Sequence, residues 1–217
     1  MAVLEELNCR EPSEPRELIG DGKNGPIETA QALWGGVDDI LIGNDDEPLL
    51  AVITGPPGVG KTTIANMIAT KITGSRFAVT TENGKEIGVS RVREAKLEMH
   101  HSCMFSTTGH RAWVINEGDK ITDDGQVAFL SLLDECPKRF HVLVTSNEDI
   151  SDWSERFETR FEVYNITKPM PLEIAEGLTT RLGVQANVAT AAAEQCGGNV
   201  RQAIKEIKAW KRKNRIS

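Results

Sequence analysis

The residues with the clearest chemical meaning lie between Gly55 and Thr62, where the sequence reads GPPGVGKT. This complete GxxxxGK[ST] pattern follows a predicted strand and opens a predicted helix. In such a loop, backbone N–H groups and the positive end of the helix surround phosphate oxygens. Lys61 would face the terminal phosphates, and the Thr62 hydroxyl would face Mg²⁺. We therefore predict a nucleoside triphosphate site with contacts from Pro56, Pro57, Gly58, Val59, Gly60, Lys61, Thr62 and Thr63.

A second polar pair, Asn116-Glu117, follows the apolar run that ends at Ile115. Phosphoryl transfer needs a metal-orienting group and a base or positioning group for the attacking water, and strand ends beside a phosphate loop can hold both. Glu117 suits the second role. Asn116 occupies the metal-orienting position, where its amide oxygen can accept a hydrogen bond from a metal-bound water but brings no charge. We expect Mg²⁺ to be held less firmly and turnover to be weakened.

Short apolar runs alternate with helical patterns over the first three quarters of the chain. The predicted strands are Pro48–Ile53, Arg76–Thr80, Arg111–Ile115, Phe140–Thr145 and Phe161–Ile166. The clearest predicted helices are Lys61–Ile72, Val89–Met99 and Gln126–Asp134. This alternation predicts an α/β fold with a parallel five-stranded sheet covered by helices on both faces.

After Lys168-Pro169 the strand patterns stop, and three helical stretches follow: Pro171–Leu182, Ala186–Cys196 and Val200–Lys213. The middle stretch ends at Gly197-Gly198, where glycine can adopt the left-handed conformation that closes a helix. The predicted domains are therefore a nucleotide-binding α/β domain over residues 1–167 and a small all-helical lid domain over residues 168–217.

Composition excludes several classes of protein. The 217 residues include 39% hydrophobic and 26% charged residues, which is typical of a globular chain rather than a disordered one. No apolar run approaches the roughly 20 residues that cross a membrane, the amino terminus is polar and acidic, and the four cysteines lack CxxC spacing. We expect a cytoplasmic protein with no membrane partner.

The formal net charge of -7 argues against a general nucleic-acid coat, but the charge is unevenly distributed. Residues 201–217 hold seven Lys or Arg and one Glu. This basic end is either a solvated helix face or a surface that contacts phosphate or a partner.

The order of these motifs resembles the AAA+ ATPases, and within them the clamp-loader small subunits of the replication factor C and DNA polymerase III clamp-loader type. The resemblance covers almost the whole chain. Its further segments are Arg10–Gly20 (adenine side), Gly88–Arg93 (DNA-tracking loop and helix), Asn116–Asp123 (acidic box), Thr145–Asn147 (first sensor), Glu158–Phe161 (Ser-Arg-Cys motif) and Gly197–Arg201 (second sensor).

The resemblance implies ATP and Mg²⁺ as cofactors and assigns roles to single residues. Catalysis would use Lys61, Glu117, Asn147 and Arg160, with Arg160 acting on the nucleotide of a neighbouring subunit. Nucleotide contacts would include Ile19, Gly20 and Arg201, and the metal would lie near Thr62 and Asn116. The implied partners are further copies of the chain or related AAA+ subunits.

The sequence departs from the family pattern in three ways. Asn116 replaces the Asp of the family, and Thr159 and Phe161 replace the Ser and Cys that flank the arginine. The sequence ends at Ser217, after the predicted lid, so we expect assembly without the helical collar with which clamp-loader subunits form their ring.

We predict an ATPase: an ATP-binding and ATP-hydrolysing AAA+ subunit of an oligomer that acts on DNA, as a clamp loader does in DNA replication. A sliding clamp or a helicase is a candidate partner. Ser90, Arg93 and Lys96 share one predicted helix face, which could follow a DNA backbone. Two alternatives stay open: a non-hydrolysing regulatory or structural AAA+ subunit, and an AAA+ helicase loader or protein remodeller.

Overall fold

The computed structural model describes residues 11–101, 103–148, 153 and 155–214. Arg10, the first residue of the predicted adenine-side segment, and the outermost residues of both predicted domains lie outside these ranges. Within the described residues, no helix is both long and apolar enough to cross a membrane.

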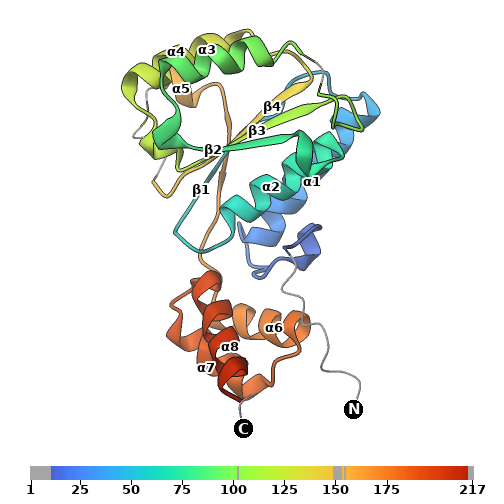
Figure 1. The fold of residues 1–217 in the computed structure, drawn as a ribbon. Helices are drawn as coiled ribbons and strands as arrows, with labels where there is room; N and C mark the ends of the chain where they lie inside the picture. The colour runs from blue at the N-terminus through green and yellow to red at the C-terminus, as the bar shows by residue number, and fades with distance from the viewer. Residues whose placement is uncertain (1–10, 102, 149–152, 154, 215–217) are drawn as a thin grey trace.

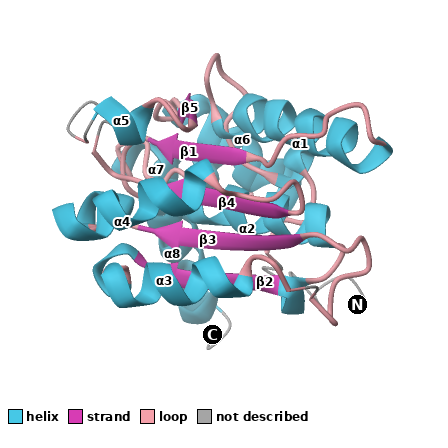
Figure 2. Cartoon of the chain, turned by 90° about the horizontal axis from the view of Figure 1, so that it is seen from above, coloured by secondary structure: helices cyan, strands magenta, loops and turns pink. Residues whose placement is uncertain are grey.

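The centre of the molecule is a parallel sheet with the strand order β2-β3-β4-β1-β5 (Figures 1 and 2). Its strands are β1 (Leu50–Thr54), β2 (Val79–Asn83), β3 (Arg111–Asn116), β4 (Phe140–Thr145) and β5 (Glu162–Asn165). The central strand β1 pairs on both sides, so that Val52 lies opposite Val144 of β4 and Val163 of β5. The predicted α/β fold with a five-stranded parallel sheet is confirmed.

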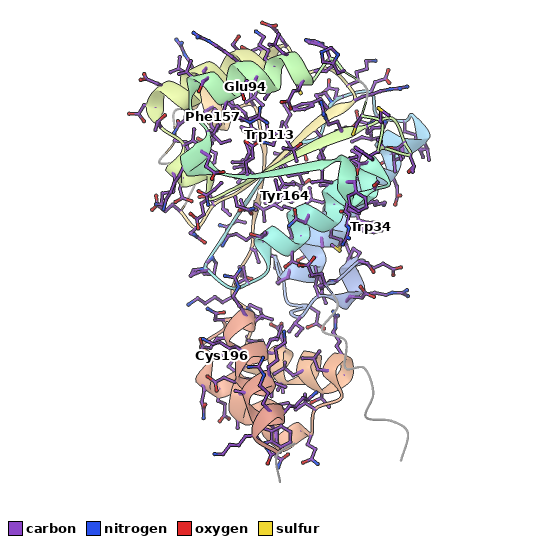
Figure 3. The ribbon with its side chains drawn as sticks, in the orientation of Figure 1. Trp34, Glu94, Trp113, Phe157, Tyr164 and Cys196 are labelled. Carbon is purple, nitrogen blue, oxygen red and sulfur yellow. The ribbon has the colours of Figure 1, made fainter. Side chains whose placement is uncertain are left out.

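Helices cover both faces of the sheet, because successive side chains of each strand point to opposite faces. One core contains Ala112 and Val114 of β3 with side chains of α1 (Pro26–Ile42) and α2 (Lys61–Thr73). The other core contains Trp113 and Ile115 of β3. It is covered by α3 (Val89–Glu98), α4 (Asp123–Asp134) and α5 (Glu155–Glu158), and Figure 3 shows Trp113 and Phe157 on this side.

The elements β2 and α1 differ from the sequence predictions, and the short helix α5 was not predicted either. The strand expected over Arg76–Thr80 lies at Val79–Asn83, because Arg76–Ala78 forms a 3-10 turn whose Phe77 N–H donates to the Ser75 hydroxyl. The helix α1 was not predicted. Its buried residues recur at helical spacing, but Gly35 and Gly36 interrupt the middle of the helix and lower its propensity.

The helices α6 (Pro171–Leu182), α7 (Ala186–Gln195) and α8 (Val200–Asn214) pack around a third core (Figure 1). Ile19, from the amino-terminal segment (residues 11–25, before α1), joins this core. It packs where α6 carries Gly177, since a Cβ at that position would lie 2.8 Å from Ile19 Cγ2. The amino-terminal segment therefore contacts the carboxy-terminal helices directly.

A buried histidine pair ties the amino-terminal ends of three strands together. His141 of β4 is fully buried; its Nδ1 accepts a hydrogen bond from the Leu49 N–H (2.9 Å), and its Nε2 lies 2.8 Å from His110 Nδ1. Burial, and then the neighbouring His110, lower the pKa of His141 to about 3. Burial, followed by Arg139, also lowers the pKa of His110.

This pair should make the fold sensitive to acid. The folded pKa of His141 lies below its ordinary value of 6.5, so between these values the unfolded chain binds more protons than the folded chain. We expect stability to fall as pH decreases from about 6.5, by up to about 1.4 kcal/mol per pH unit from His141. Urea unfolding between pH 7 and 5 measures this, and His141→Asn should show a shallower pH dependence. Exposed His100 provides the control, and an unchanged slope in His141→Asn would contradict the assignment.

Candidate functional site

The loop between β1 and α2 has a backbone that favours glycine at three positions, since Gly55, Gly58 and Gly60 all have a positive φ. Gly55 has φ 138°, and a Cβ there would collide with the Ile166 carbonyl oxygen. Gly58 has φ 84°, and a Cβ there would collide with the Asn199 side chain. The Gly58 carbonyl accepts a hydrogen bond from the Arg201 N–H (3.2 Å). The phosphate-loop motif therefore folds as a close turn at the carboxyl edge of the sheet, in contact with the start of α8.

Lys61 is buried at the first position of α2 and is 7% exposed. Its Nζ donates to the carbonyl oxygens of Gly55 (2.6 Å) and Pro56 (2.8 Å) and to Asn147 Oδ1 (2.9 Å). Burial, and then nearby Arg201, lower the pKa of Lys61 to about 8, although Asp119 acts in the opposite direction. All three acceptors are neutral, so an anion beside this ammonium would be strongly attracted.

Thr62 and Asn116 meet beside this lysine. Thr62 Oγ1 donates to Asn116 Oδ1 (2.9 Å), which also accepts from Thr145 Oγ1 (3.2 Å). Mg²⁺ prefers oxygen ligands and usually keeps several waters, so these two neutral oxygens fit a hydrated Mg²⁺ bound mainly through phosphates. Among the described residues, no group of three or more His, Cys, Asp or Glu could hold a metal ion. A cation here would therefore depend on phosphate charge more than on side-chain charge.

Glu117 follows β3 in a left-handed conformation, with φ 56° and ψ 53°. This conformation is uncommon for a residue with a side chain and is often found at functional sites. Asn83 Nδ2, at the end of β2, donates to Glu117 Oε2 (3.3 Å). Sequence reasoning missed Asn83, because its place beside Glu117 depends on the pairing of β2 with β3, for which the sequence carries no local signal.

Asp119 is a second residue that sequence reasoning did not single out. Its side chain is 2% exposed, its Oδ1 accepts from Ser146 Oγ (3.3 Å) and the Asn147 N–H (3.4 Å), and its Oδ2 pairs with Lys120 Nζ (2.7 Å). Burial alone would raise the pKa of Asp119, but hydrogen bonds from Lys120 and Asn147 lower it below its usual value. This buried carboxylate holds the turn that carries Asn147 toward Lys61.

A cavity of about 480 Å³ lies between the phosphate loop, the amino-terminal segment, α6 and α8. Six of the predicted nucleotide contacts line it: Ile19, Gly58, Val59, Gly60, Thr63 and Arg201. Within the described part of the chain, Gly20, Pro56, Pro57, Lys61 and Thr62 are not lining residues. Gly20 packs between Pro26 and Pro169, and Thr62 lines an adjacent hollow beside α2.

Arg160 lies at the opposite edge of the sheet from the phosphate loop, where the strands begin. It lies two residues before the start of β5, at the amino ends of the parallel strands, whereas the carboxyl ends carry the phosphate loop, Glu117 and Asn147. Its Nε donates to Asp134 Oδ1 (2.9 Å) and its Nη1 to the Arg156 carbonyl (3.0 Å). The fold therefore does not bring Arg160 to the phosphate loop of its own chain.

The predicted DNA-tracking face of α3 is smaller than expected. Ser90 and Arg93 are exposed, but Lys96 Nζ turns to α4, where it contacts Glu135 (2.6 Å) and Ser131 (2.9 Å). The helical spacing placed Lys96 on this face correctly, but its long side chain reaches a carboxylate on the neighbouring helix. Ser90 and Arg93 remain as exposed members of the predicted face.

A comparison with protein families matches residues 51–167 to the ATPase family associated with various cellular activities (AAA), which is more than half of the chain. The chain belongs to the AAA family. The matched range begins in β1, just before the phosphate loop, and ends just after β5. The AAA match therefore includes the whole carboxyl edge of the sheet described above.

Solved structures with this AAA fold include the Thermotoga maritima RuvB Holliday junction branch migration motor and two mutants of it. Each has a TM-score of 0.72 and is 16% identical in sequence. The aligned regions cover 90% of this chain and 63% of the RuvB chain, so the chain spans less than two thirds of these relatives. At this identity the similarity shows a shared fold. No curated protein matches the sequence.

Proposed function

We propose that this AAA chain binds ATP with Mg²⁺ and hydrolyses it, as a subunit of an oligomer that acts on DNA. The observation that carries the proposal is the hydrogen bond from Lys61 Nζ to Asn147 Oδ1 (2.9 Å), which joins the phosphate loop to the end of β4. Around it, the fold gathers Thr62, Asn116 and Glu117 at one sheet edge. These are the groups that phosphoryl transfer requires.

In this proposal each residue acts on a different part of the nucleotide. Lys61 and the loop backbone bind the terminal phosphates, and Arg201 approaches them from α8. Thr62 and Asn116 would hold Mg²⁺, which supplies charge neutralisation for the phosphates when bound. Glu117 orients and deprotonates the attacking water, and Asn147 orients it through its amide.

Lys61→Ala tests nucleotide binding. Loss of the buried ammonium should weaken ATP affinity at least tenfold, or about 1.4 kcal/mol, while the fold persists. Titration calorimetry measures the affinity, and the melting temperature controls for folding. Lys85→Ala, a matched change at an exposed lysine, should leave the affinity unchanged. Equal affinity in Lys61→Ala and the parent would remove Lys61 from the site.

Asn116 supports one alternative, a non-hydrolysing regulatory or structural subunit, because the residue adds no charge beside Thr62. Asn116→Asp keeps the acceptor for Thr62 and Thr145 and adds a carboxylate. We expect this variant to hydrolyse ATP faster and to need less Mg²⁺ for half-maximal turnover, measured across a Mg²⁺ series. Unchanged kinetics would mean that the amide suffices, and the regulatory alternative would lose its main support.

The position of Arg160, away from the phosphate loop of its own chain, supports an oligomer in which neighbours complete each site. DNA as the target is supported by exposed Arg93, by the basic end of α8, and by the fold shared with a branch migration motor. A clamp-loader-like role with a sliding clamp or helicase partner is the finer form of this proposal. Helicase loading and protein remodelling are its alternatives.

Steady-state ATP hydrolysis with and without primed DNA, together with the mass of the assembly in ATP, tests the proposal. Faster turnover with DNA and an ATP-dependent oligomer are expected. An ATP hydrolysis rate that is the same with and without DNA would favour protein remodelling. A monomer in ATP would contradict the shared site. The core that α6 to α8 form, which Ile19 joins from the amino-terminal segment, supports the proposed division into residues 1–167 and 168–217.

A further inference from the structure

The cavity beside the phosphate loop has a second end, which lies away from the loop. The first residues of α8 contact the loop, since the Arg201 N–H donates to the Gly58 carbonyl (3.2 Å). Lys211, about ten positions further and so roughly 15 Å along the helix axis, donates its Nζ to the Leu182 carbonyl (3.2 Å). The end of α6 therefore borders the far end of the cavity, beyond the space for the phosphates.

The lining of the cavity combines apolar side chains with charged ones, which include Arg181, Glu17, Lys205 and Lys208. Leu18 and Ile19 of the amino-terminal segment and Leu182 and Ile204 of the carboxy-terminal helices supply apolar side chains to this lining. Arg181 lies in the last turn of α6. An apolar lining with a few placed polar groups is typical of a site for a small molecule or cofactor.

Arg181 has an unused hydrogen-bond donor. Its Nη1 is buried and has no hydrogen-bond partner among the described residues. Burial lowers the pKa of Arg181, and the carboxylates of Glu17 and Asp21 oppose that change. The nearby Glu17 carboxylate accepts hydrogen bonds from the backbone N–H (2.6 Å) and hydroxyl (3.0 Å) of Ser13. A buried N–H without a partner costs free energy, which a ligand that supplies an acceptor would recover.

We propose that Arg181 recognises the base of the bound nucleotide, with Nη1–H donating to an acceptor atom on the edge of a purine ring. The inference rests on the proposed ATP site and adds a specificity residue to it. A purine offers flat faces to the walls formed by Leu18, Ile19, Leu182 and Ile204, and ring nitrogens at its edge to the guanidinium. Because Arg181 belongs to α6, base binding would also fix the carboxy-terminal helices against the amino-terminal segment.

The test compares ATP with ribose 5-triphosphate, which lacks the base, as ligands of the full chain. Arg181→Met should weaken ATP affinity at least tenfold and leave the affinity for ribose 5-triphosphate unchanged, measured by titration calorimetry. Arg181→Lys keeps a donor and should lose less affinity for ATP. Arg212→Met is the matched control, because Arg212 is exposed and is not a cavity-lining residue; it should change neither affinity.

Equal losses for both ligands would place Arg181 on the ribose or phosphates and overturn the inference, as would an unchanged ATP affinity. If Arg181→Met does not fold, as judged by its melting temperature, Arg181→Leu, which also lacks a donor, replaces it, with the same expected result. If the parent fails to bind ATP, the proposed function falls together with this inference. If the parent binds ATP and Lys61→Ala does not, while Arg181 variants bind ATP normally, only this inference fails.

Discussion

The Glu117→Gln protein is expected to bind ATP within threefold of the parent affinity and to hydrolyse it at least a hundredfold more slowly. Gln keeps the size of the side chain, and its amide oxygen can still accept the hydrogen bond from Asn83 Nδ2. It cannot take a proton from water, and a positioned general base contributes about 10²- to 10⁴-fold to a rate. Single-turnover hydrolysis with excess protein, alongside calorimetric binding, measures both quantities.

Two further variants test whether this loss of turnover is specific to the Glu117 carboxylate. Glu148→Gln removes a carboxylate near the same sheet edge, where it contacts Lys120 (3.4 Å), and should leave turnover unchanged. Asn83→Ala keeps the Glu117 carboxylate but removes its partner, so it should change turnover less than Glu117→Gln does. If Glu117→Gln turns over ATP at the parent rate, Glu117 is not the base; if it loses ATP binding, the residue belongs to the nucleotide contacts.

The phosphate loop could be predicted from the sequence because its requirements are local. The backbone angles and close contacts of one short turn require glycine at positions 55 and 58. Lys61 and Thr62 follow in the same short stretch of chain. The Lys61 contact with Asn147 is not local. The order of strands nevertheless indicated it, since carboxyl ends of parallel strands meet at one edge of a sheet.

Asn83 and Asp119 could not be assigned from the sequence, because their positions depend on pairing between strands. The register of β2 with β3 places Asn83 opposite Asn116 and so beside Glu117. Edge strand β2 has half-exposed side chains without a long apolar run, so its position was predicted several residues too early. The position of Asp119 depends on the turn that begins at Gly118. A Cβ on Gly118 would lie 2.9 Å from the Trp153 ring.

Arg181 and Lys96 show the same limit for long side chains. Sequence periodicity places both on helices but cannot say which neighbouring element their charged ends reach. Lys96 contacts Glu135, which directly follows α4, whereas Arg181 lines a cavity that exists only where the amino-terminal segment packs on the carboxy-terminal helices. Such contacts follow from tertiary packing, which a periodic pattern does not specify.

Arg160→Ala should bind ATP like the parent but turn it over at least roughly a thousandfold more slowly, since an arginine supplied across an interface contributes about 10³ to 10⁵ to such rates. In the structure Arg160 pairs with Asp134 (2.9 Å), with exposed side-chain fractions of 35% and 53%. A pair this exposed is worth at most about 1 kcal/mol. Arg160 can therefore exchange Asp134 for the phosphates of a neighbour at little cost. Asp134→Asn, which weakens the pair, should keep the parent turnover.

Mixing Arg160→Ala with Glu117→Gln separates a shared site from a structural role. Each variant alone lacks one component of every site, but a mixed oligomer contains sites in which intact Glu117 faces intact Arg160 of the next subunit. With random head-to-tail assembly about one site in four is complete, so turnover should recover to about that fraction of the parent rate. Arg156→Ala, at an exposed arginine one helical turn earlier, is the matched control and should be active alone. If native mass spectrometry confirms mixed oligomers and turnover does not recover, the role of Arg160 is its contact with Asp134 inside one chain, and the shared site is wrong.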